Sequence, residues 1–463
     1  MIRASRAILS IVCLLLILAP TGAAAQAEAP VYIVQEGDTL IGIAIRFGIA
    51  ADDLAAANGL ADPSAIFPGM RLRLPGFEGI SGVLETRPVA LGENLRSLSL
   101  RYGATPQDLA RINRVVHPSR LYVGQPFIVP VPEGEPGPAA RLVSTGPTDG
   151  PLVTAARLGV NPWLLDARNE GRIRAWILPG EPIAAPGDEA SLGALPPAIA
   201  SAEIAPTRPK QGDTAVVRVR LALDGALSGF LGERTLNFVV DDDPLERVAL
   251  QGIHALAEPG LVDLGLAFVP ADASQPPFAF VQPIRIDEGE YGRERLTVPP
   301  ETVDPANTLP EDRQVAEILS VVTPERLWDG PFRFPSTYFE TFPSFFGTRR
   351  NYNDGGWTSY HTGLDLYGNE DTQVLAPAPG VVVFAGPLVV RGNTTYIDHG
   401  WGVYTGYLHQ SQIFVQPGDR VATGDVIGMV GATGRVTGAH LHWEVWVGGV
   451  PVQPLDWTER TYP

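Results

Sequence analysis

The most informative stretch of the chain is an octapeptide near its end, which reads His440-Leu441-His442-Trp443-Glu444-Val445-Trp446-Val447. Its β-branched and aromatic residues favour a strand. Side chains of a strand alternate between two faces, so His440, His442 and Glu444 share one face and the apolar residues share the other. We therefore predict a strand with one buried apolar face and two neighbouring imidazoles on the opposite face, an arrangement suited to a metal site.

Other histidines gather around this octapeptide. Of the chain's seven histidines, five lie between His361 and His442. Upstream, the segment 360–365 places His361 and Asp365 four residues apart, and in an extended segment these two side chains share a face. Two histidines and one aspartate leave an open coordination position, which is the arrangement of catalytic zinc. His409 ends another run, residues 402–409, that we predict to be a strand.

Taken together, these motifs resemble the lysostaphin-type (LytM-type) zinc metallopeptidases over about residues 340–457. The resemblance implies a compact, mostly antiparallel β-domain with a peptide-binding groove. It also implies that His361, Asp365 and His442 bind Zn²⁺, and that His409 and His440 line the site and act in catalysis. Both are candidates for the general base, and of the two we prefer His440. Flanking stretches that share the resemblance are residues 346–350, 376–382, 397–400 and 424–428.

Several neighbouring residues have less certain roles in the sequence. Glu444 is expected to support the site rather than to react, and His399 is expected to be a turn residue at the end of a strand. Gln410 replaces a leucine that many members of the family carry after the third histidine, and this change could alter the groove. Aromatic residues that could wall the groove or pack in a core are Tyr352, Trp357, Tyr360 and Tyr404.

The N-terminal third contains an internal repeat with a period of 55–56 residues. Gly48, Asn58 and Pro75 of the first copy recur as Gly103, Asn113 and Pro130 in the second, and Gly159, Asn169 and Pro186 follow in a third. Each copy reads as strand, helix, helix and strand, and the pattern resembles the LysM module, which implies binding to glycans such as peptidoglycan. We assign modules to residues 31–76 and 86–131 and a degenerate third copy to 141–187; the second and third copies could also be spacers that have lost the ligand groove.

Residues 196–300 show alternating apolar patterns separated by turns, which predicts an immunoglobulin-like β-sandwich that serves as a spacer. We read residues 301–335 as a linker with a short helix at 311–322, and residues 336–463 as the metallopeptidase domain. In the sandwich His254 stands alone, so no chemistry is predicted there. The fold class is therefore multidomain and mainly β.

Composition limits the partners and the compartment. The 463 residues carry a formal net charge of −17 and no dense basic patch, which argues against nucleic acid. Residues 1–25 combine two arginines, an apolar run and small residues, which predicts a cleaved signal peptide, and no stable membrane span is expected after cleavage. The single cysteine, Cys13, lies in that segment. We expect a secreted protein of the cell envelope or cell wall.

The leading hypothesis is an exported zinc metalloendopeptidase that hydrolyses peptide cross-links or stems of peptidoglycan, targeted to the glycan by LysM modules. One alternative is a catalytically silent wall-binding protein that regulates or activates other hydrolases. A cupin-like iron enzyme is a third, because two histidines and a carboxylate also suit non-haem iron, but its ligand spacing is met only if Glu444 serves.

Overall fold

A computed structural model describes residues 29–117, 120–132, 141–146, 149–169, 171–173, 177–178, 180–186, 195–337 and 342–463. The predicted signal peptide lies outside these residues. None of the helices in this described part is long and apolar enough to cross a membrane. The chain divides into two compact units, Met1–Glu85 with Pro130–Gly134 and Thr86–Val129 with Glu135–Pro463, and each is described by itself.

The first unit contains the first repeat, in which a short strand is followed by two short helices and a second short strand. The Thr39 hydroxyl accepts a hydrogen bond from the Gly42 N–H at the start of the first helix, and Gly48 ends that helix in the left-handed conformation. Its buried residues include Leu40 and Leu54. The elements are β1 (Val31–Ile33), α1 (Leu40–Phe47), α2 (Ala51–Ala57) and β2 (Arg71–Arg73).

The other two copies repeat this order of elements, as predicted. In each copy one asparagine at the end of the second helix donates to a carbonyl four residues earlier and pairs through both amide atoms with a backbone group fifteen residues later. Asn58, Asn113 and Asn169 make these bonds at 2.6–2.9 Å. The elements are β3 (Val83–Pro88), α3 (Leu95–Tyr102), α4 (Pro106–Ile112), β4 (Pro126–Val131), β5 (Arg141–Ser144), α5 (Pro151–Arg157), α6 (Pro162–Arg168) and β6 (Pro182–Ala185).

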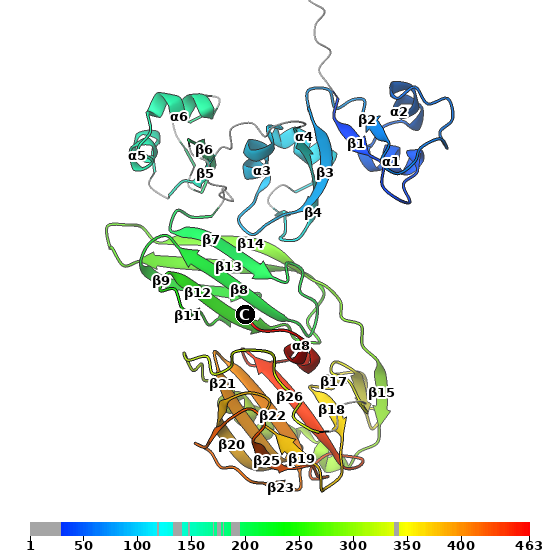
Figure 1. Cartoon of the computed structure of the whole chain (residues 1–463), viewed down its shortest axis with the longest axis vertical. Helices are drawn as coiled ribbons and strands as arrows, with labels where there is room; N and C mark the ends of the chain where they lie inside the picture. Colours follow the sequence, from blue (N-terminus) through cyan, green and yellow to red (C-terminus); the bar gives the residue numbers. More distant parts are fainter. Residues whose placement is uncertain are drawn as a thin grey trace, which may run out of the picture. The chain divides into compact units, whose positions relative to one another are not determined.

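The middle of the chain forms a β-sandwich of two four-stranded sheets (Figure 1), with strand orders β10-β9-β13-β14 and β11-β12-β8-β7. Alternating residues such as Val217, Val219 and Leu264 face the shared core and are fully buried. The strands are β7 (Ile199–Ala205), β8 (Thr214–Leu221), β9 (Gly225–Leu231), β10 (Arg234–Leu236), β11 (Val239–Val240), β12 (Glu246–Gly252), β13 (Gly260–Pro270) and β14 (Phe278–Ile286).

The segment between the sandwich and the C-terminal sheet packs against that sheet rather than acting as a loose linker. Strand β15 (Arg293–Leu296) pairs with β16 (Arg349–Tyr352) in parallel. Helix α7 (Pro305–Ile318) follows a short 3₁₀ turn at Pro300–Thr302, and its Val315 packs on Tyr396 and Tyr404. The helix begins six residues before the predicted start because Asp304 caps it, accepting from the Ala306 N–H, and Pro305 occupies its first turn.

The C-terminal part is built on a seven-stranded sheet, with the path β18-β26-β22-β21-β20-β24 and β27 paired to β26. A second sheet has the order β19-β25-β23. The predicted strand at 440–447 is confirmed as β26. The elements are β17 (Ser359–Tyr360), β18 (Leu364–Tyr367), β19 (Gln373–Leu375), β20 (Gly380–Leu388), β21 (Gly392–Gly400), β22 (Val403–Gln410), β23 (Gln412–Ile413), β24 (Arg420–Val421), β25 (Val426–Met429), β26 (His440–Val447), β27 (Val450–Val452) and α8 (Pro454–Glu459).

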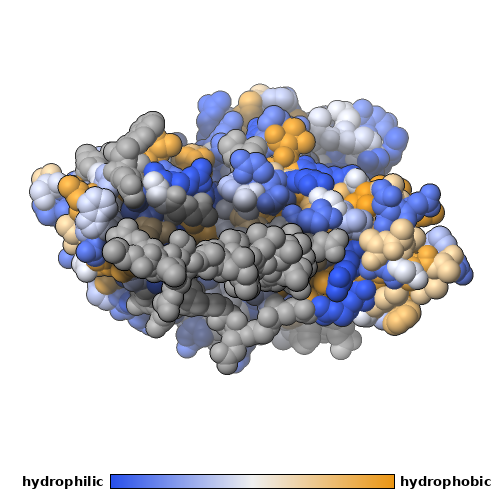
Figure 2. Space-filling view, turned by 90° about the horizontal axis from the view of Figure 1, so that it is seen from above, coloured by the Kyte–Doolittle hydropathy of each residue, from blue (hydrophilic) through white to orange (hydrophobic). Residues whose placement is uncertain are grey.

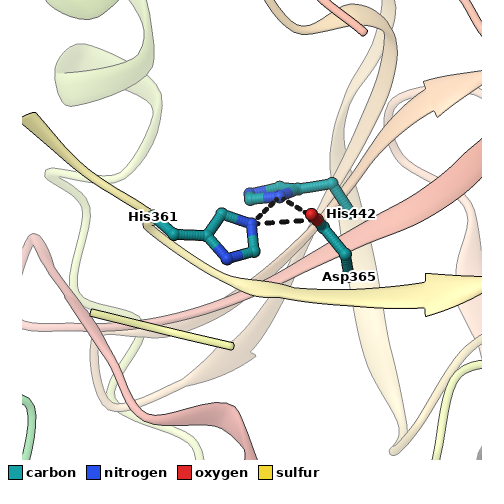
Figure 3. Close-up of side chains that lie close together, drawn as sticks. All are labelled: His361, Asp365 and His442. Carbon is teal, nitrogen blue, oxygen red and sulfur yellow. Dashed lines mark hydrogen bonds and ion pairs between the residues drawn. The ribbon is translucent and has the colours of Figure 1, made fainter. Parts of the chain in front are cut away.

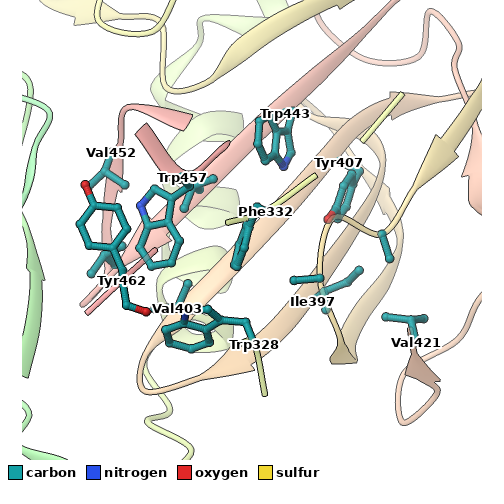
Figure 4. Packing of buried hydrophobic residues seen from close by; sticks show 14 of the residues in the cluster. Trp328, Phe332, Ile397, Val403, Tyr407, Val421, Trp443, Val452, Trp457 and Tyr462 are labelled. Atoms are coloured by element: carbon teal, nitrogen blue, oxygen red, sulfur yellow. Dashed lines mark hydrogen bonds between the residues drawn. The ribbon is translucent and has the colours of Figure 1, made fainter. Parts of the chain in front are cut away.

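The core beneath this sheet is rich in tryptophan (Figure 4). Trp443 extends from the apolar face of β26, whereas Trp328 and Phe332 come from the segment that precedes the sheet. Trp328 contacts Trp457 edge to face at 5.8 Å between ring centroids and donates to the Tyr462 carbonyl at 2.7 Å. Residues 328–332 are therefore part of the core that supports the polar face of β26.

Hydrophilic and hydrophobic residues are interspersed on the face that Figure 2 shows. Large apolar side chains such as Ile41, Ile45 and Trp163 are exposed on the repeats.

Candidate metal centre

Three predicted ligands converge at one point on the C-terminal sheet (Figure 3). Asp365 of β18 lies directly opposite His442 of β26 in the antiparallel register, and His361 enters from the turn after β17. His361 Nε2 lies 2.9 Å from Asp365 Oδ1 and 2.8 Å from His442 Nδ1, and His442 Nδ1 lies 2.8 Å from Asp365 Oδ1. All three residues are buried.

The outer atoms of the two rings determine which inner atoms carry lone pairs. His361 Nδ1 lies 2.9 Å from the Phe345 carbonyl oxygen, so it must donate its proton there. His442 Nε2 lies 3.2 Å from Glu444 Oε1 and is placed to donate to that carboxylate. These bonds leave His361 Nε2 and His442 Nδ1 as lone-pair atoms that face the Asp365 carboxylate.

Three lone-pair atoms at such short distances need a cation between or beside them. A proton can bridge only two of the three atoms, whereas a metal ion binds all three. Two imidazoles and one carboxylate are the donor set of a catalytic zinc site with one open position. The outer bonds to Phe345 and Glu444 are the second-sphere contacts that orient such ligands. The residues present therefore fit Zn²⁺.

The electrostatic environment of the three residues agrees with this arrangement. Burial lowers the pKa of His361 to about 4, despite the nearby carboxylate, so the ring is neutral near pH 7. Burial alone would raise the pKa of Asp365, but the electrostatic influence of the adjoining His361 and His442 rings holds that pKa well below its usual range. Arg350 Nη2 lies 3.5 Å from the second oxygen of Asp365. Asp365 therefore stays ionised.

The other two predicted site residues, His409 and His440, lie together beside the three ligands. Their ring centroids are 5.1 Å apart, and the His409 ring is 5.9 Å from that of His442. His409 Nδ1 donates to the Thr433 carbonyl at 2.8 Å and His440 Nδ1 to the Gly438 carbonyl at 2.9 Å. Each ring thus has Nε2 left as its proton acceptor, and His440 Nε2 lies 3.6 Å from Asp365 Oδ1.

His409 adopts an unusual backbone conformation. It is one of five non-glycine residues with a positive φ in the described part of the chain, at 65°, and such a conformation persists only where surrounding contacts enforce it. Its N–H donates to the Arg391 carbonyl at 3.0 Å. Burial, together with His442 and His440, holds the pKa of His409 well below its usual range, so this ring is neutral near pH 7.

Helix α7 holds the loop that positions His409. The buried Glu311 carboxylate accepts from the Val390 N–H at 2.7 Å and from the Arg391 N–H at 3.2 Å, and it pairs with the Arg391 guanidinium at 2.7 Å. Asp312 adds a second, more exposed contact to that guanidinium. The sequence pattern did not indicate this role, because Glu311 in a helix with many charged residues resembles a solvated residue.

Glu444 acts as predicted, as a support for the site. It is fully buried and accepts from Thr362 at 2.6 Å and from the Trp446 indole N–H at 2.8 Å, in addition to His442. Burial opposes its ionisation, but these donors lower its pKa to about 2. Glu444 also accepts from the Tyr396 hydroxyl of β21 at 3.2 Å, so it joins His442 to the residues that surround it.

Two cavities meet at the histidines. A cavity of about 720 Å³ and a second of about 330 Å³ share Arg350, Tyr352, His409, Arg435 and His442 as lining residues. Between them they present Asp365, His442 and the His409 and His440 rings to an open groove, whereas the buried His361 lines neither cavity. The expectation that Tyr352 and Tyr360 line this groove agrees with the larger cavity, whereas Trp357 stacks under Arg293 and Arg295.

His254 of the β-sandwich also lines the larger cavity, which corrects the prediction that no chemistry gathers there. Its Nδ1 accepts from the Leu256 N–H at 3.1 Å, so Nε2 carries the proton and donates to the Tyr360 hydroxyl at 3.2 Å. Tyr360 in turn is the last residue of β17 and directly precedes His361. A single histidine in a strand pattern gave no signal of this contact, which joins residues 106 positions apart.

Three further residues whose roles the sequence left less certain take definite places in the structure. His399 is a buried residue of β21, not a turn residue; it donates to the Pro379 carbonyl and accepts from Thr405, so it is a core histidine. Tyr404 packs in the core, with its hydroxyl on the Val321 carbonyl. Gln410 is buried and bonds Thr395, and it is absent from the lining of both cavities.

Comparison with known proteins supports the resemblance drawn from the sequence. Residues 359–454 match peptidase family M23, and residues 32–75 and 89–130 match the LysM domain. The chain is 40% identical over 127 residues to the DD-carboxypeptidase/endopeptidase Mpg of Neisseria meningitidis serogroup B. The aligned stretch covers 27% of this chain and 29% of that protein.

A second relative and one solved structure extend the comparison. The chain is 38% identical over 116 residues to the peptidoglycan DD-endopeptidase ShyC of Vibrio cholerae, 25% of this chain and 27% of that protein. The chain therefore aligns with less than a third of the length of these relatives. A crystal structure of a peptidase M23 from Pseudomonas aeruginosa matches with a TM-score of 0.39 and 25% identity, covering 55% of this chain and 96% of that one.

Proposed function

We propose that this chain, which combines a peptidase family M23 domain with LysM domains, is an exported zinc metalloendopeptidase that hydrolyses peptide cross-links or stems of bacterial peptidoglycan. The observation that carries the proposal is the cluster of His361, Asp365 and His442. Its three lone-pair atoms face one another at 2.8–2.9 Å, and Asp365 and His442 line the groove. The relatives named above support the choice of a peptide substrate.

The chemistry divides between the metal and the chain. Zn²⁺ would be held by His361, Asp365 and His442, and when bound it supplies Lewis-acid activation of water and of the scissile carbonyl. Hydrolysis also requires a proton to leave the attacking water and a proton to reach the departing amine. We assign the first transfer to His440 Nε2. The His440 side chain is 17% exposed, so water can reach it, and its Nδ1 is held by the Gly438 carbonyl.

His409 has the complementary task in this proposal. Its Nδ1 donates to Thr433, and its Nε2 has no protein partner among the described residues, so it faces the groove as a neutral acceptor. A neutral imidazole at this place can orient the attacking water and share the proton that passes to the amine. Arg391 and Thr433 keep the ring in register with His440 throughout.

The LysM modules provide the second part of the proposal. Binding to glycan strands would hold the peptidase groove near its peptide substrates, so even a weak affinity of each module raises the local substrate concentration. We propose that the protein works in the cell envelope or cell wall, where this polymer lies, after export directed by residues 1–25.

Mass spectrometry of fragments released from purified sacculi tests the proposal. Zinc-loaded protein is expected to release peptides with new termini, and a His409→Ala variant is expected to release none under the same conditions. Absence of release by both proteins, with zinc bound and sacculus binding intact, would instead favour the regulatory protein that activates other hydrolases.

A further inference from the structure

Arg435 occupies a prominent place in the groove. It lines both cavities that flank the three-ligand cluster, and it extends from the loop that also supplies Thr433 to the His409 ring. Its backbone N–H donates to the Val390 carbonyl at 2.8 Å, so the base of the side chain is fixed to the same loop that carries Arg391. The guanidinium therefore has a defined position beside the reacting groups.

The side chain itself is only partly satisfied. Nη1 donates to the Thr302 carbonyl at 3.0 Å, and the guanidinium carbon lies 4.4 Å from the centroid of the Tyr352 ring. Within the part of the chain that the structure describes, no carboxylate forms an ion pair with Arg435. One hydrogen bond to a carbonyl and one stacked ring leave Nε and Nη2 as donors without a protein acceptor.

The two other arginines that line the larger cavity, Arg350 and Arg391, each have a carboxylate partner, which Arg435 lacks among the described residues. Arg350 lies 3.5 Å from Asp365 and 3.5 Å from Glu294, and Arg391 lies 2.7 Å from Glu311. Burial, with these two like charges nearby, lowers the pKa of Arg435 from its ordinary value, although a guanidinium remains protonated near pH 7. A half-buried positive charge without a counter-ion is energetically unfavourable, and an incoming anion would relieve it.

The chemistry of the cavity defines the anion. A guanidinium that is stacked on one ring and bonded at one end offers a single planar pair of donors, which matches one carboxylate. Glu294, Asp312 and Glu444 line the same two cavities, so a phosphate with two negative charges would meet repulsion that a single carboxylate largely avoids. The site is therefore built for a singly charged, planar anion.

We propose that Arg435 is a substrate-binding residue that holds a free carboxylate of the peptide close to the amide bond that is cleaved. This inference rests on the proposed peptidase function and narrows the substrate class to acidic peptides. The carboxylate could be a terminal α-carboxylate or one on a side chain, and both present the same planar anion to the guanidinium. The Tyr352 ring, which stacks on the guanidinium of Arg435, keeps that guanidinium in place.

Steady-state kinetics on matched peptides tests the proposal with the zinc-loaded full chain. The parent peptide contains the bond identified in the sacculus digest, and two derivatives carry a carboxamide at the terminal or at the side-chain carboxylate. One derivative is expected to be cleaved with a kcat/KM about 10- to 100-fold lower, because a charge-assisted hydrogen-bonded pair is lost. The identity of that derivative distinguishes the two sources of the anion.

Variants then connect the effect to Arg435. Arg435→Met is expected to lower kcat/KM on the parent peptide by the same factor and to cleave all three peptides alike. Arg435→Lys, which keeps the charge and loses the planar pair of donors, should retain part of the discrimination. Arg420→Met, at an exposed position on β24, is the matched control and should behave as the wild type does.

The possible outcomes separate this inference from the proposed function. If the wild type cleaves neither the three peptides nor the sacculi, the peptidase assignment itself is contradicted. Equal cleavage of all three peptides by the wild type, or full discrimination by Arg435→Met, overturns the carboxylate site while leaving the peptidase intact. If Arg435→Met does not fold, the wild-type comparison and the lysine variant still decide the question.

Discussion

The two halves of the candidate site are built in different ways. Asp365 and His442 face each other because β18 and β26 pair in regular antiparallel register, and His361 joins them from the turn after β17. His409 has a positive φ at the end of β22, and its place depends on the Arg391 carbonyl, the Thr433 carbonyl and, through Arg391, on helix α7. Regular strand geometry sets the first half, and contacts from distant segments set the second.

Substitution of a metal-binding residue should have the largest effect, because the first half of the site would then no longer hold the metal. His442→Ala leaves two protein ligands, so we expect zinc content after dialysis to fall to a small fraction of one equivalent and peptide release to become undetectable. Metal analysis and the sacculus digest measure both effects. His117→Ala, at an exposed position, is the control. A variant that keeps a full equivalent of zinc and normal turnover would contradict the ligand assignment.

The second half should fail without loss of the metal. We expect His409→Ala to bind zinc as the wild type does and to lose about 10²–10⁴-fold in kcat, the usual contribution of a proton-transfer residue. Turnover of a defined peptide and metal content are measured on the same preparation. Loss of zinc in parallel with activity would show that the two halves are not independent.

Helix α7 provides a sharper test of the contrast. Glu311→Gln removes the charge that pairs with the buried Arg391, so the free energy of unfolding should fall by about 3–5 kcal/mol. Well below the unfolding temperature, kcat should fall with zinc content unchanged. The matched control is Asp312→Asn, since Asp312 is 57% exposed and its pairing should contribute less than about 1 kcal/mol.

A fragment that begins at residue 336 would make the same point on a larger scale. It lacks α7, β15, Trp328 and Phe332, which all pack on or pair with the C-terminal part. We expect it to be unstable and inactive even though it contains the four site histidines and the one site aspartate. A fragment from residue 290 should fold better, and thermal denaturation of the two fragments compares them directly.

Part of the site could be proposed from local patterns in the sequence. A strand repeats every two residues, so His440, His442 and Glu444 could be assigned to one face without any tertiary information. The four-residue spacing singled out His361 and Asp365, and the resemblance to a family supplied the roles of these residues and of His409. Contacts such as Glu311 with Arg391 and His254 with Tyr360 join residues 80 and 106 positions apart, and no periodicity in the chain records them.

His399 offers the smallest test, because it is buried like the site histidines but lies outside both halves. Burial lowers its pKa to about 4 from an ordinary 6.5. The unfolded chain therefore binds the proton first on acidification, so the stabilisation is complete above pH 6.5 and is lost as the pH falls towards 4. Between pH 7 and 5.5 the loss should be about 1 kcal/mol.

Urea denaturation at the two pH values measures this change. A His399→Gln variant removes the titrating group, so its free energy of unfolding should depend less on pH by that amount. An identical pH dependence in the two proteins would show that the pKa of His399 is the same in the folded and unfolded chains, contrary to its burial in the folded state.

The asparagines of the three repeats have a consequence for how such a chain can evolve. One amide in each copy joins the end of the second helix to the last strand by the same three bonds. Residues 141–187 lie outside the two stretches that match the LysM domain, yet Asn169 makes these bonds in full. A module can thus vary in the rest of its sequence while one side chain keeps its second helix joined to its last strand.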